Sequence, residues 1–351
     1  MKTFLEIDGS ASGGQTLRTG LALSLVTGRP ARFLHIRGQR AKPGLMRQHL
    51  TCVHAASAIG AAKTDGVALG STEITFAPTE APRPDAYEWA IGTAGSTTLL
   101  AQCLLPALWS AERPSVLVLR GGTHNSMAPP FDFFHRSFLG ALAVMGVPVE
   151  ANLEKIGFSP AGGGRIRIEM PGKAKPKAIR WEQPEPVGRK RLRVLTRNVP
   201  SGVGSRVAKA AQDASGWPDS TVVLDQDPSE ETQSSGVCAM MEVETGGRWE
   251  MSSVLGERRL SSEVVGARVA RGMGHFLASG AVVGRFLADQ LILPMALGEG
   301  GSFVTMAPTD HLRTHALLIE RFDIARVAIE EWKPKTGLWR VVVHPRSLGN
   351  S

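Results

Sequence analysis

The sequence has few cysteines and no long apolar segment, and each absence excludes a class of protein. Its three cysteines, Cys52, Cys103 and Cys238, are far apart and match no zinc-binding or redox spacing. An odd number of cysteines without an export signal predicts reduced thiols and a cytoplasmic location. No apolar run approaches the ~20 residues needed to cross a bilayer, so no membrane association is expected. Residues 1–8 contain an early acidic residue and are typical of an opening strand rather than a signal peptide.

The common phosphate-binding fingerprints are also missing. Residues 8–15, DGSASGGQ, contain neither the Gly-Lys-Ser/Thr of a Walker A loop nor a Gly-x-Gly-x-x-Gly pattern. They lie between a predicted strand and a predicted helix, where exposed backbone N–H groups could bind an anion. Taken alone, the loop is better explained as an ordinary tight turn. The nine histidines show no metal-ligand spacing, so no metal ligands can be assigned.

Acidic residues are missing between Arg18 and Arg47, although the whole chain carries 32 of them against 40 Lys and Arg, a net charge of +8. Planar guanidinium groups bind phosphate through two hydrogen bonds, so several in a short span favour phosphate binding. On charge alone, an ordinary solvated face is an equally good explanation. The cations of this stretch are Arg18, Arg29, Arg32, Arg37, Arg40, Lys42 and Arg47.

Hydrophobic periodicity predicts alternating strands and helices, which is typical of an α/β layer protein. Strands are predicted at residues 3–7, 33–36, 73–76 and 115–119, and helices at 15–26, 45–59, 97–109 and 131–144. Two similar apolar helices, at 100–108 and 287–297, are each followed by a strand and a histidine, which indicates an internal repeat.

The composition changes between residues 183 and 274. Two prolines, Gly188 and the basic run Arg189-Lys190-Arg191 begin this segment. We therefore predict a small α/β domain at 183–274, inserted into a large domain of repeated α/β units formed by residues 1–182 and 275–351.

His311 is the strongest candidate for catalysis. It follows Asp310 in what is predicted to be a loop after an apolar strand. With a pKa near 6.5, an imidazole is largely neutral at pH 7 and can act as a nucleophile. A single histidine is nevertheless more often structural than catalytic.

Several motifs together resemble the RNA 3′-terminal phosphate cyclase family along most of the chain. The best stretches are residues 36–49, with the run Arg-x-x-Arg-x-Lys-Pro-Gly-Leu-x-Arg-Gln-His, and 283–311, with Leu-Ala-Asp-Gln-Leu-x-Leu-Pro. Residues 90–102, 121–132 and 157–164 also match, in the same order. The segment 183–274 resembles the family poorly.

The resemblance implies an ATP-dependent ligase that converts an RNA 3′-terminal phosphate into a 2′,3′-cyclic phosphodiester. His311 would attack the α-phosphorus of ATP and hold AMP covalently. The AMP would pass to the RNA 3′-phosphate, giving an RNA-(3′)pp(5′)A intermediate, and the 2′-hydroxyl would then close the ring. A divalent cation, Mg²⁺, would accompany ATP. Because the chain has one Tyr and 6% aromatic residues, contacts to the RNA backbone and phosphates are expected rather than base stacking.

The resemblance also assigns residues to each part of the site. Phe286 and Pro130 would sandwich the adenine. The remaining nucleotide-pocket residues would be Gln102, Leu287, Ala288, Asp289 and Gln290. Charge on the ATP phosphates or the RNA end would be offset by Arg18, Arg37, Arg40, Lys42 and Arg47.

The chain departs from the family pattern at three places. Residues 11–15 lack the usual glutamate of the Gly-rich loop, Arg285 replaces a frequent Glu, and His315 a frequent Asn. Two alternatives follow: a non-catalytic RNA-binding or ribosome-assembly relative, and an enolpyruvyl transferase, which has similar repeated units. His311 argues against the first, because non-catalytic relatives lack the histidine, and the second class does not need it.

Overall fold

Three copies of one βαβαββ unit form the body of the protein. The computed structural model describes residues 3–217, 221–226 and 234–346. In the first unit, β1 and β2 are parallel, β4 is antiparallel to β2, and the strand order is β1-β2-β4-β3. Its elements are β1 (Leu5–Asp8), α1 (Gln15–Thr27), β2 (Ala31–Leu34), α2 (Arg47–Ile59), β3 (Lys63–Asp65) and β4 (Ile74–Ala77).

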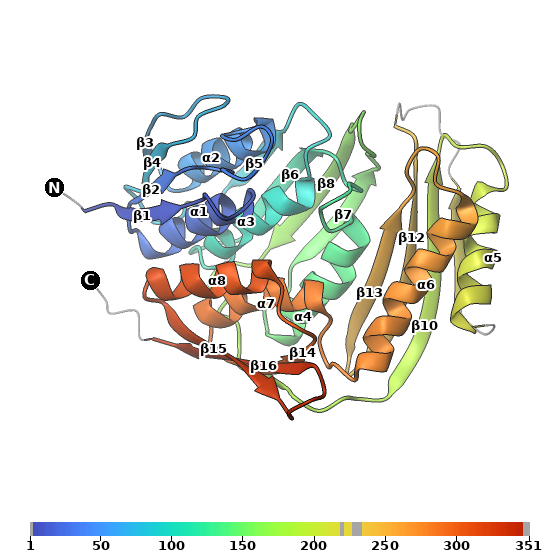
Figure 1. Ribbon diagram of the computed structural model, residues 1–351. Coiled ribbons are helices and arrows are strands. Elements are labelled where there is room, and N and C mark those ends of the chain that lie inside the picture. The colour runs from blue at the N-terminus through green and yellow to red at the C-terminus, as the bar shows by residue number, and fades with distance from the viewer. Residues whose placement is uncertain (1–2, 218–220, 227–233, 347–351) are drawn as a thin grey trace.

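The other two units repeat this strand order, as β5-β6-β8-β7 and β9-β14-β16-β15 (Figure 1). The second consists of β5 (Ala86–Ala90), α3 (Thr97–Trp109), β6 (Ser115–Gly121), η1 (Phe133–Leu139), α4 (Gly140–Val144), β7 (Glu150–Lys155) and β8 (Gly164–Met170). The third consists of β9 (Ile179–Trp181), α7 (Arg285–Leu297), β14 (Gly301–Thr305), α8 (Asp310–Arg321), β15 (Ala325–Trp332) and β16 (Leu338–Pro345). The predicted fold class of repeated α/β units is confirmed.

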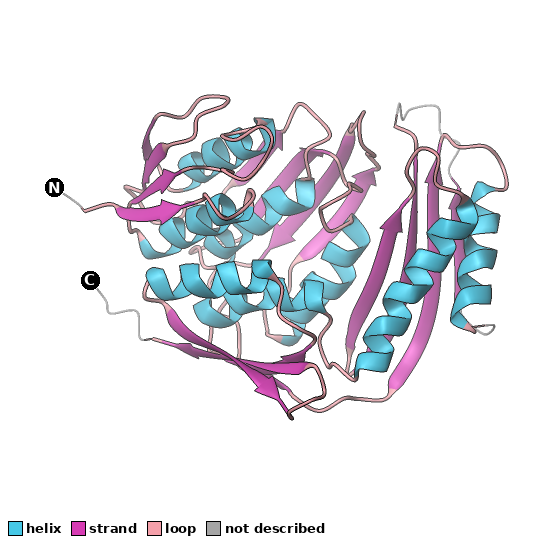
Figure 2. Ribbon diagram, in the orientation of Figure 1, coloured by secondary structure: helices cyan, strands magenta, loops and turns pink. Residues whose placement is uncertain are grey.

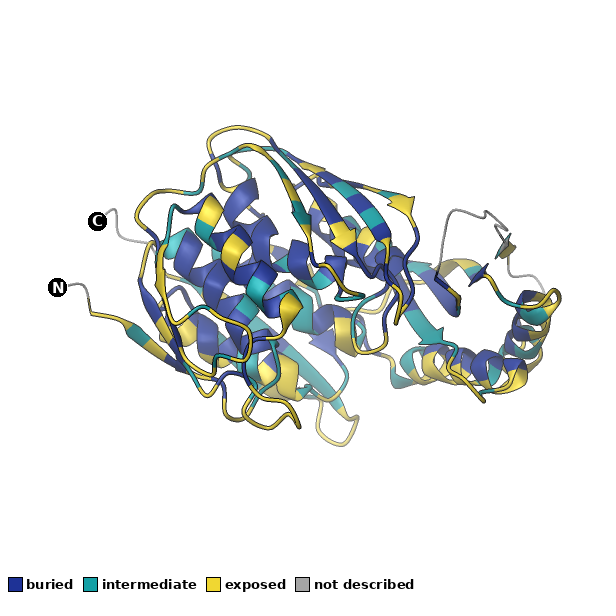
Figure 3. Cartoon of the chain, turned by 90° about the horizontal axis from the view of Figure 1, so that it is seen from above, coloured by how far each residue is buried: buried dark blue, intermediate teal, exposed yellow. Residues whose placement is uncertain are grey.

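The third unit is interrupted after β9 by a separate sheet with its own hydrophobic core. The inserted elements are β10 (Val187–Arg197), α5 (Val203–Ser215), β11 (Thr221–Gln226), β12 (Gly236–Thr245), β13 (Arg248–Leu255) and α6 (Ser262–Ser279). Helices α5 and α6 cover one face of this sheet, and β13 faces η1 and α4 of the large body (Figure 2). Figure 3 shows the insert beside the body, with residues coloured as buried in both parts. Helix α6 runs past residue 274, where the sequence placed the boundary.

The first helices of the second and third units, α3 and α7, are closely related in sequence and in position. Each has 13 residues, with Gln at the sixth place (Gln102, Gln290) and Pro at the tenth (Pro106, Pro294). Both are buried along most of their length, which explains their strong apolar signal. The edge strands β3 and β5 were not predicted because most of their residues are exposed or half-buried and carry no apolar pattern. The predicted helix at 131–144 exists, but residues 133–139 form π-helix.

The described helices do not include one that is both long and apolar enough to span a membrane. The three cysteines are free and buried. Cys52 on α2 and Cys103 on α3 lie beside Arg18 of α1, so α1, α2 and α3 meet at the position of that arginine.

Candidate active site

A cavity of about 1000 Å³ opens between the helices of the large body and the inserted sheet. One end is formed by the loop before α1, the loop before α2 and the start of α8, and the other by α3, α7 and the segment before η1. Strand β13 of the insert closes one side with Met251, Ser253 and Leu255. The cavity is therefore built from all three repeats and the insert.

His311 lies at the start of α8, with its exposed ring on the cavity wall. Thr309 caps the helix: its hydroxyl oxygen accepts a hydrogen bond from the Leu312 N–H at 3.0 Å. The amide of Gln15 from α1 donates to the backbone carbonyl of His311 at 2.8 Å. Capping and this contact between repeats hold the backbone, so the imidazole is presented from a rigid helix end.

The surroundings keep His311 neutral. Partial burial lowers the pKa of His311, the charges of Arg18 and Arg40 lower it further, and Asp310 opposes them. A neutral imidazole has a free lone pair, so His311 can act as a nucleophile at neutral pH.

Three arginines create a positive field at this end of the cavity. In the part of the chain that the structure describes, Arg18, Arg37 and Arg40 form no ion pair. Arg37 is oriented by its own loop, because its Nη1 donates to the carbonyls of Lys42 and Gly44 at 2.7 and 2.8 Å. Unpaired cations that face a cavity favour an anionic ligand.

Glycines of the loop before α1 let these side chains approach the backbone. A Cβ on Gly14 would lie 2.1 Å from Nε2 of His49 and 2.8 Å from Nη1 of Arg18, and one on Gly13 would lie 3.2 Å from Nη2 of Arg40. Burial lowers the pKa of His49 to about 3, and Arg18 and Arg37 contribute to this. His49 therefore packs as a neutral ring between the glycine and the arginines.

Polar side chains of α3, α7 and α8 join the His311 end of the cavity to the end with the exposed ring of Phe286. The amide of Gln102 donates to the side-chain oxygen of Gln290, which joins α3 to α7. Burial raises the pKa of Asp289 to about 7, although Thr309 donates its hydroxyl to Oδ1 at 2.5 Å. Burial lowers the pKa of His315 to about 4, and its Nδ1 lies 2.6 Å from the carbonyl oxygen of Asp289.

Comparison with known proteins decides the family. The family model described as RNA 3′-terminal phosphate cyclase matches residues 10–329. A protein from Ectopseudomonas mendocina (strain ymp), named RNA 3′-terminal phosphate cyclase, is 40% identical over 325 residues, which covers 92% of this chain and 93% of the relative. The chain belongs to the RNA 3′-terminal phosphate cyclase family. This membership excludes the enolpyruvyl transferase alternative.

The cavity gathers most of the residues that the cyclase resemblance assigned to a site, including those farthest apart in sequence. These are Arg18, Arg37, Arg40, Gln102, Pro130, Phe286, Asp289, Gln290 and His311. Leu287 and Ala288 do not line the cavity, because their side chains are buried in the hydrophobic core. Lys42 and Arg47 are exposed and do not line the cavity.

Sequence reasoning missed several residues of the cavity. Gln15 and His49 lie within the motifs at residues 8–15 and 36–49, but neither residue type in isolation indicates a site. Ser253 and Arg268 belong to the insert, where resemblance to the cyclases is poor, and no sequence signal identified them. Only the packing of the insert against the body brings them to the cavity.

No group of three or more His, Cys, Asp or Glu side chains that could hold a metal ion occurs in residues 3–217, 221–226 and 234–346. The carboxylates of Asp289 and Glu257 face the cavity singly. A divalent cation would therefore lack a complete protein-built site among these residues.

Proposed function

We propose that this protein uses ATP to convert the 3′-terminal phosphate of RNA into a 2′,3′-cyclic phosphodiester, with His311 as the residue that carries AMP. Membership of the cyclase family supports the reaction class. The observation that carries the residue assignment is the neutral, exposed imidazole of His311 in the same cavity as three arginines that form no ion pair in the described part of the chain.

In the first step a ring nitrogen of His311 attacks the α-phosphorus of ATP. A nitrogen–phosphorus bond forms, the bond to the β-phosphate oxygen breaks, and pyrophosphate leaves with the bonding pair. The other ring nitrogen releases its proton. Arg18, Arg37 and Arg40 would stabilise the charge that develops on the leaving pyrophosphate, which explains why cations surround a residue that must itself stay neutral.

In the second step an oxygen of the RNA 3′-phosphate attacks the same phosphorus and the nitrogen–phosphorus bond breaks, giving RNA-(3′)pp(5′)A. In the third, the 2′-hydroxyl attacks the RNA phosphorus, loses its proton and expels AMP. This last step is intramolecular, so positioning supplies much of its rate.

The adenine would lie between Phe286 and Pro130, with Gln102, Asp289 and Gln290 beside it. We further propose that Mg²⁺ enters with ATP, because Mg²⁺ is commonly bound by one or two carboxylates together with substrate phosphates. When bound, it would neutralise phosphate charge. Cytoplasmic location stays a prediction from the sequence.

Covalent labelling tests the nucleophile. The protein is incubated with α-labelled ATP and Mg²⁺, denatured, and examined for label on the polypeptide. We expect label on the wild type and on His275→Ala, an exposed histidine of α6 away from the cavity, and none on His311→Ala. An unlabelled wild type, or equal label on His311→Ala, would refute the assignment.

A second assay separates an enzyme from a non-catalytic RNA-binding relative. An oligonucleotide with a 3′-phosphate is incubated with ATP and the protein, and the terminus is tested for resistance to phosphatase. A cyclase makes the end resistant and releases AMP, whereas a binding protein leaves the end sensitive.

A further inference from the structure

Two of the polar contacts between the inserted domain and the large body, called anchors below, reach the segments that carry Pro130 and Phe286. The first anchor involves the loop that ends in Pro130, and the second the start of α7, which carries Phe286. Both anchoring side chains, Arg193 and Glu250, come from the inserted sheet.

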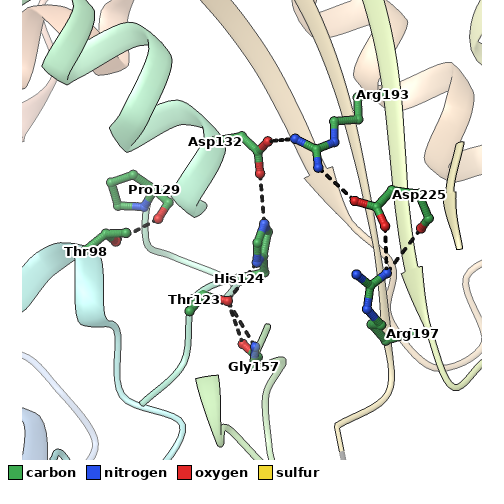
Figure 4. A network of polar contacts seen from close by, with 9 residues as sticks. All are labelled: Thr98, Thr123, His124, Pro129, Asp132, Gly157, Arg193, Arg197 and Asp225. Carbon is green, nitrogen blue, oxygen red and sulfur yellow. Dashed lines mark hydrogen bonds and ion pairs between the residues drawn. The ribbon is translucent and has the colours of Figure 1, made fainter. Parts of the chain in front are cut away.

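The first anchor joins Arg193 of β10 to Asp132. Nη1 of Arg193 donates to Oδ1 of Asp132, and His124 Nε2 lies 3.1 Å from Oδ2 of the same carboxylate (Figure 4). Burial by itself would raise the pKa of Asp132, but His124 and the charges of Arg193 and Arg136 keep it below its usual value. Asp132 is therefore a buried anion shared by the body and the insert.

This contact restrains the cavity wall because His124 and Asp132 flank the segment that contains Pro130. His124 Nδ1 lies 2.9 Å from the hydroxyl of Thr123, which accepts the Gly157 N–H at 3.0 Å. Within the segment, the hydroxyl of Thr98 donates to the carbonyl of Pro129 at 2.8 Å. The body therefore holds the segment at its start and centre, and the insert holds its end.

Arg193 is itself oriented within the insert. Its Nη2 donates to Oδ2 of Asp225 on β11 at 2.8 Å, and Arg197 donates to Oδ1 of that carboxylate at 3.0 Å (Figure 4). A buried ion pair adds little net stability compared with apolar packing, but it restricts direction and distance. The arrangement is thus suited to holding Asp132, and the segment that ends there, in a fixed position.

The second anchor joins Glu250 of β13 to Gly284, the residue before α7. The Gly284 N–H donates to Oε1 of Glu250 at 3.0 Å, and a Cβ on Gly284 would lie 2.6 Å from Oε2. On the same strand, Arg248 donates to the carbonyl of Val282 at 2.5 Å. These buried groups hold Gly284, which precedes α7 and lies two residues before Phe286.

We propose that the inserted domain sets the width of the nucleotide end of the cavity, with Arg193 and Glu250 as positioning residues that hold Pro130 and Phe286 at the separation an adenine ring needs. This inference rests on the proposed function, because it assumes that a nucleotide base lies between those two residues. It assigns the insert a role in nucleotide binding although the insert lies outside the three repeats.

Binding of two probes tests the proposal. Binding of AMP needs the cavity end that holds Pro130 and Phe286. Binding of pyrophosphate needs only the end with Arg18, Arg37 and Arg40, called the arginine end. For Arg193→Met and Glu250→Met we expect the Kd of AMP to rise about tenfold, which corresponds to ~1.4 kcal/mol, with the Kd of pyrophosphate changed less than about twofold. Glu250→Gln keeps an oxygen acceptor for Gly284 and Arg193→Lys keeps the cation, so both should stay closer to wild type.

The matched control is Arg189→Met. Arg189 lies on the same strand as Arg193, but its carboxylate partner, Glu244, belongs to the insert, so AMP binding should not change. Unchanged AMP binding in both Met variants refutes the proposal. The proposal is also refuted if the Met variants bind both probes more weakly by the same factor. It is likewise refuted if thermal unfolding shows that the Met variants have lost their fold and that Arg193→Lys and Glu250→Gln have lost it too. If the wild type binds pyrophosphate but no adenine nucleotide, the proposed function itself fails.

Discussion

Gly14→Ala should disturb the centre of the arginine end while leaving the backbone conformation accessible. Gly14 has φ −74° and ψ −3°, which alanine adopts freely, so backbone strain is not expected. The added Cβ would instead lie 2.1 Å from Nε2 of His49 and 2.8 Å from Nη1 of Arg18, whereas non-bonded heavy atoms prefer roughly 3.5 Å or more. The overlap exceeds what a small adjustment can relieve.

His49 cannot retreat easily, because it is buried and its Nδ1 accepts the Met46 N–H at 3.3 Å. Forcing an extra carbon into such a site costs about 1–3 kcal/mol. At about 2 °C per kcal/mol for a protein of this size, Gly14→Ala should lower the Tm by ~4 °C. Displacement of Arg18 should also reduce labelling by α-labelled ATP.

Gly13→Ala is the matched control. A Cβ there meets only the far end of the exposed Arg40 side chain, at 3.2 Å, so we expect a Tm within about 1 °C of wild type. Thermal unfolding followed by circular dichroism, with labelling in parallel, compares the two variants. Equal Tm values and equal labelling for Gly13→Ala and Gly14→Ala would show that the packing of His49 against the loop is not as described.

Two further predictions concern pH. Because the pKa of His49 is about 3 when folded and near 6.5 when unfolded, the unfolded chain binds the extra proton between these values, and stability falls as pH decreases from 6.5, by up to ~1.4 kcal/mol per pH unit. His49→Gln should flatten urea-unfolding free energies measured from pH 7 to 5; an unchanged slope would contradict burial of the neutral ring. Asp289 has the opposite sign: its pKa is about 7 when folded and near 3.8 when unfolded, so it stabilises the folded state at low pH and this contribution is lost as pH rises through 7. The free energy of unfolding of Asp289→Asn, relative to wild type, should therefore increase from pH 6 to pH 8. If Asp289→Asn is less stable than wild type by the same amount at both pH values, the carboxylate is not desolvated.

Local sequence patterns predicted the parts of the fold that carry a strong apolar signal. Helix α3 was predicted at its observed bounds and α1 to within one residue, because both have long, nearly continuous apolar stretches. Strands β3, β5 and β7 were missed because they are short or largely exposed at the edges of their sheets. An edge strand is defined by its neighbour's hydrogen bonds, which a local pattern does not record.

His311 and the arginine-rich loop were identifiable from the sequence because their motifs are short and contiguous. Their proximity in the folded protein could not be identified from the sequence, because it depends on long-range contacts. For example, Gln15 contacts the carbonyl of His311 across 296 positions of the chain. The neutral state of the imidazole likewise depends on burial and on Arg18 and Arg40, which come from another repeat. Residue types and motifs along the chain thus specify the kind of chemistry and the repeated α/β architecture, whereas long-range packing sets the separation, burial and charge of the groups that perform it.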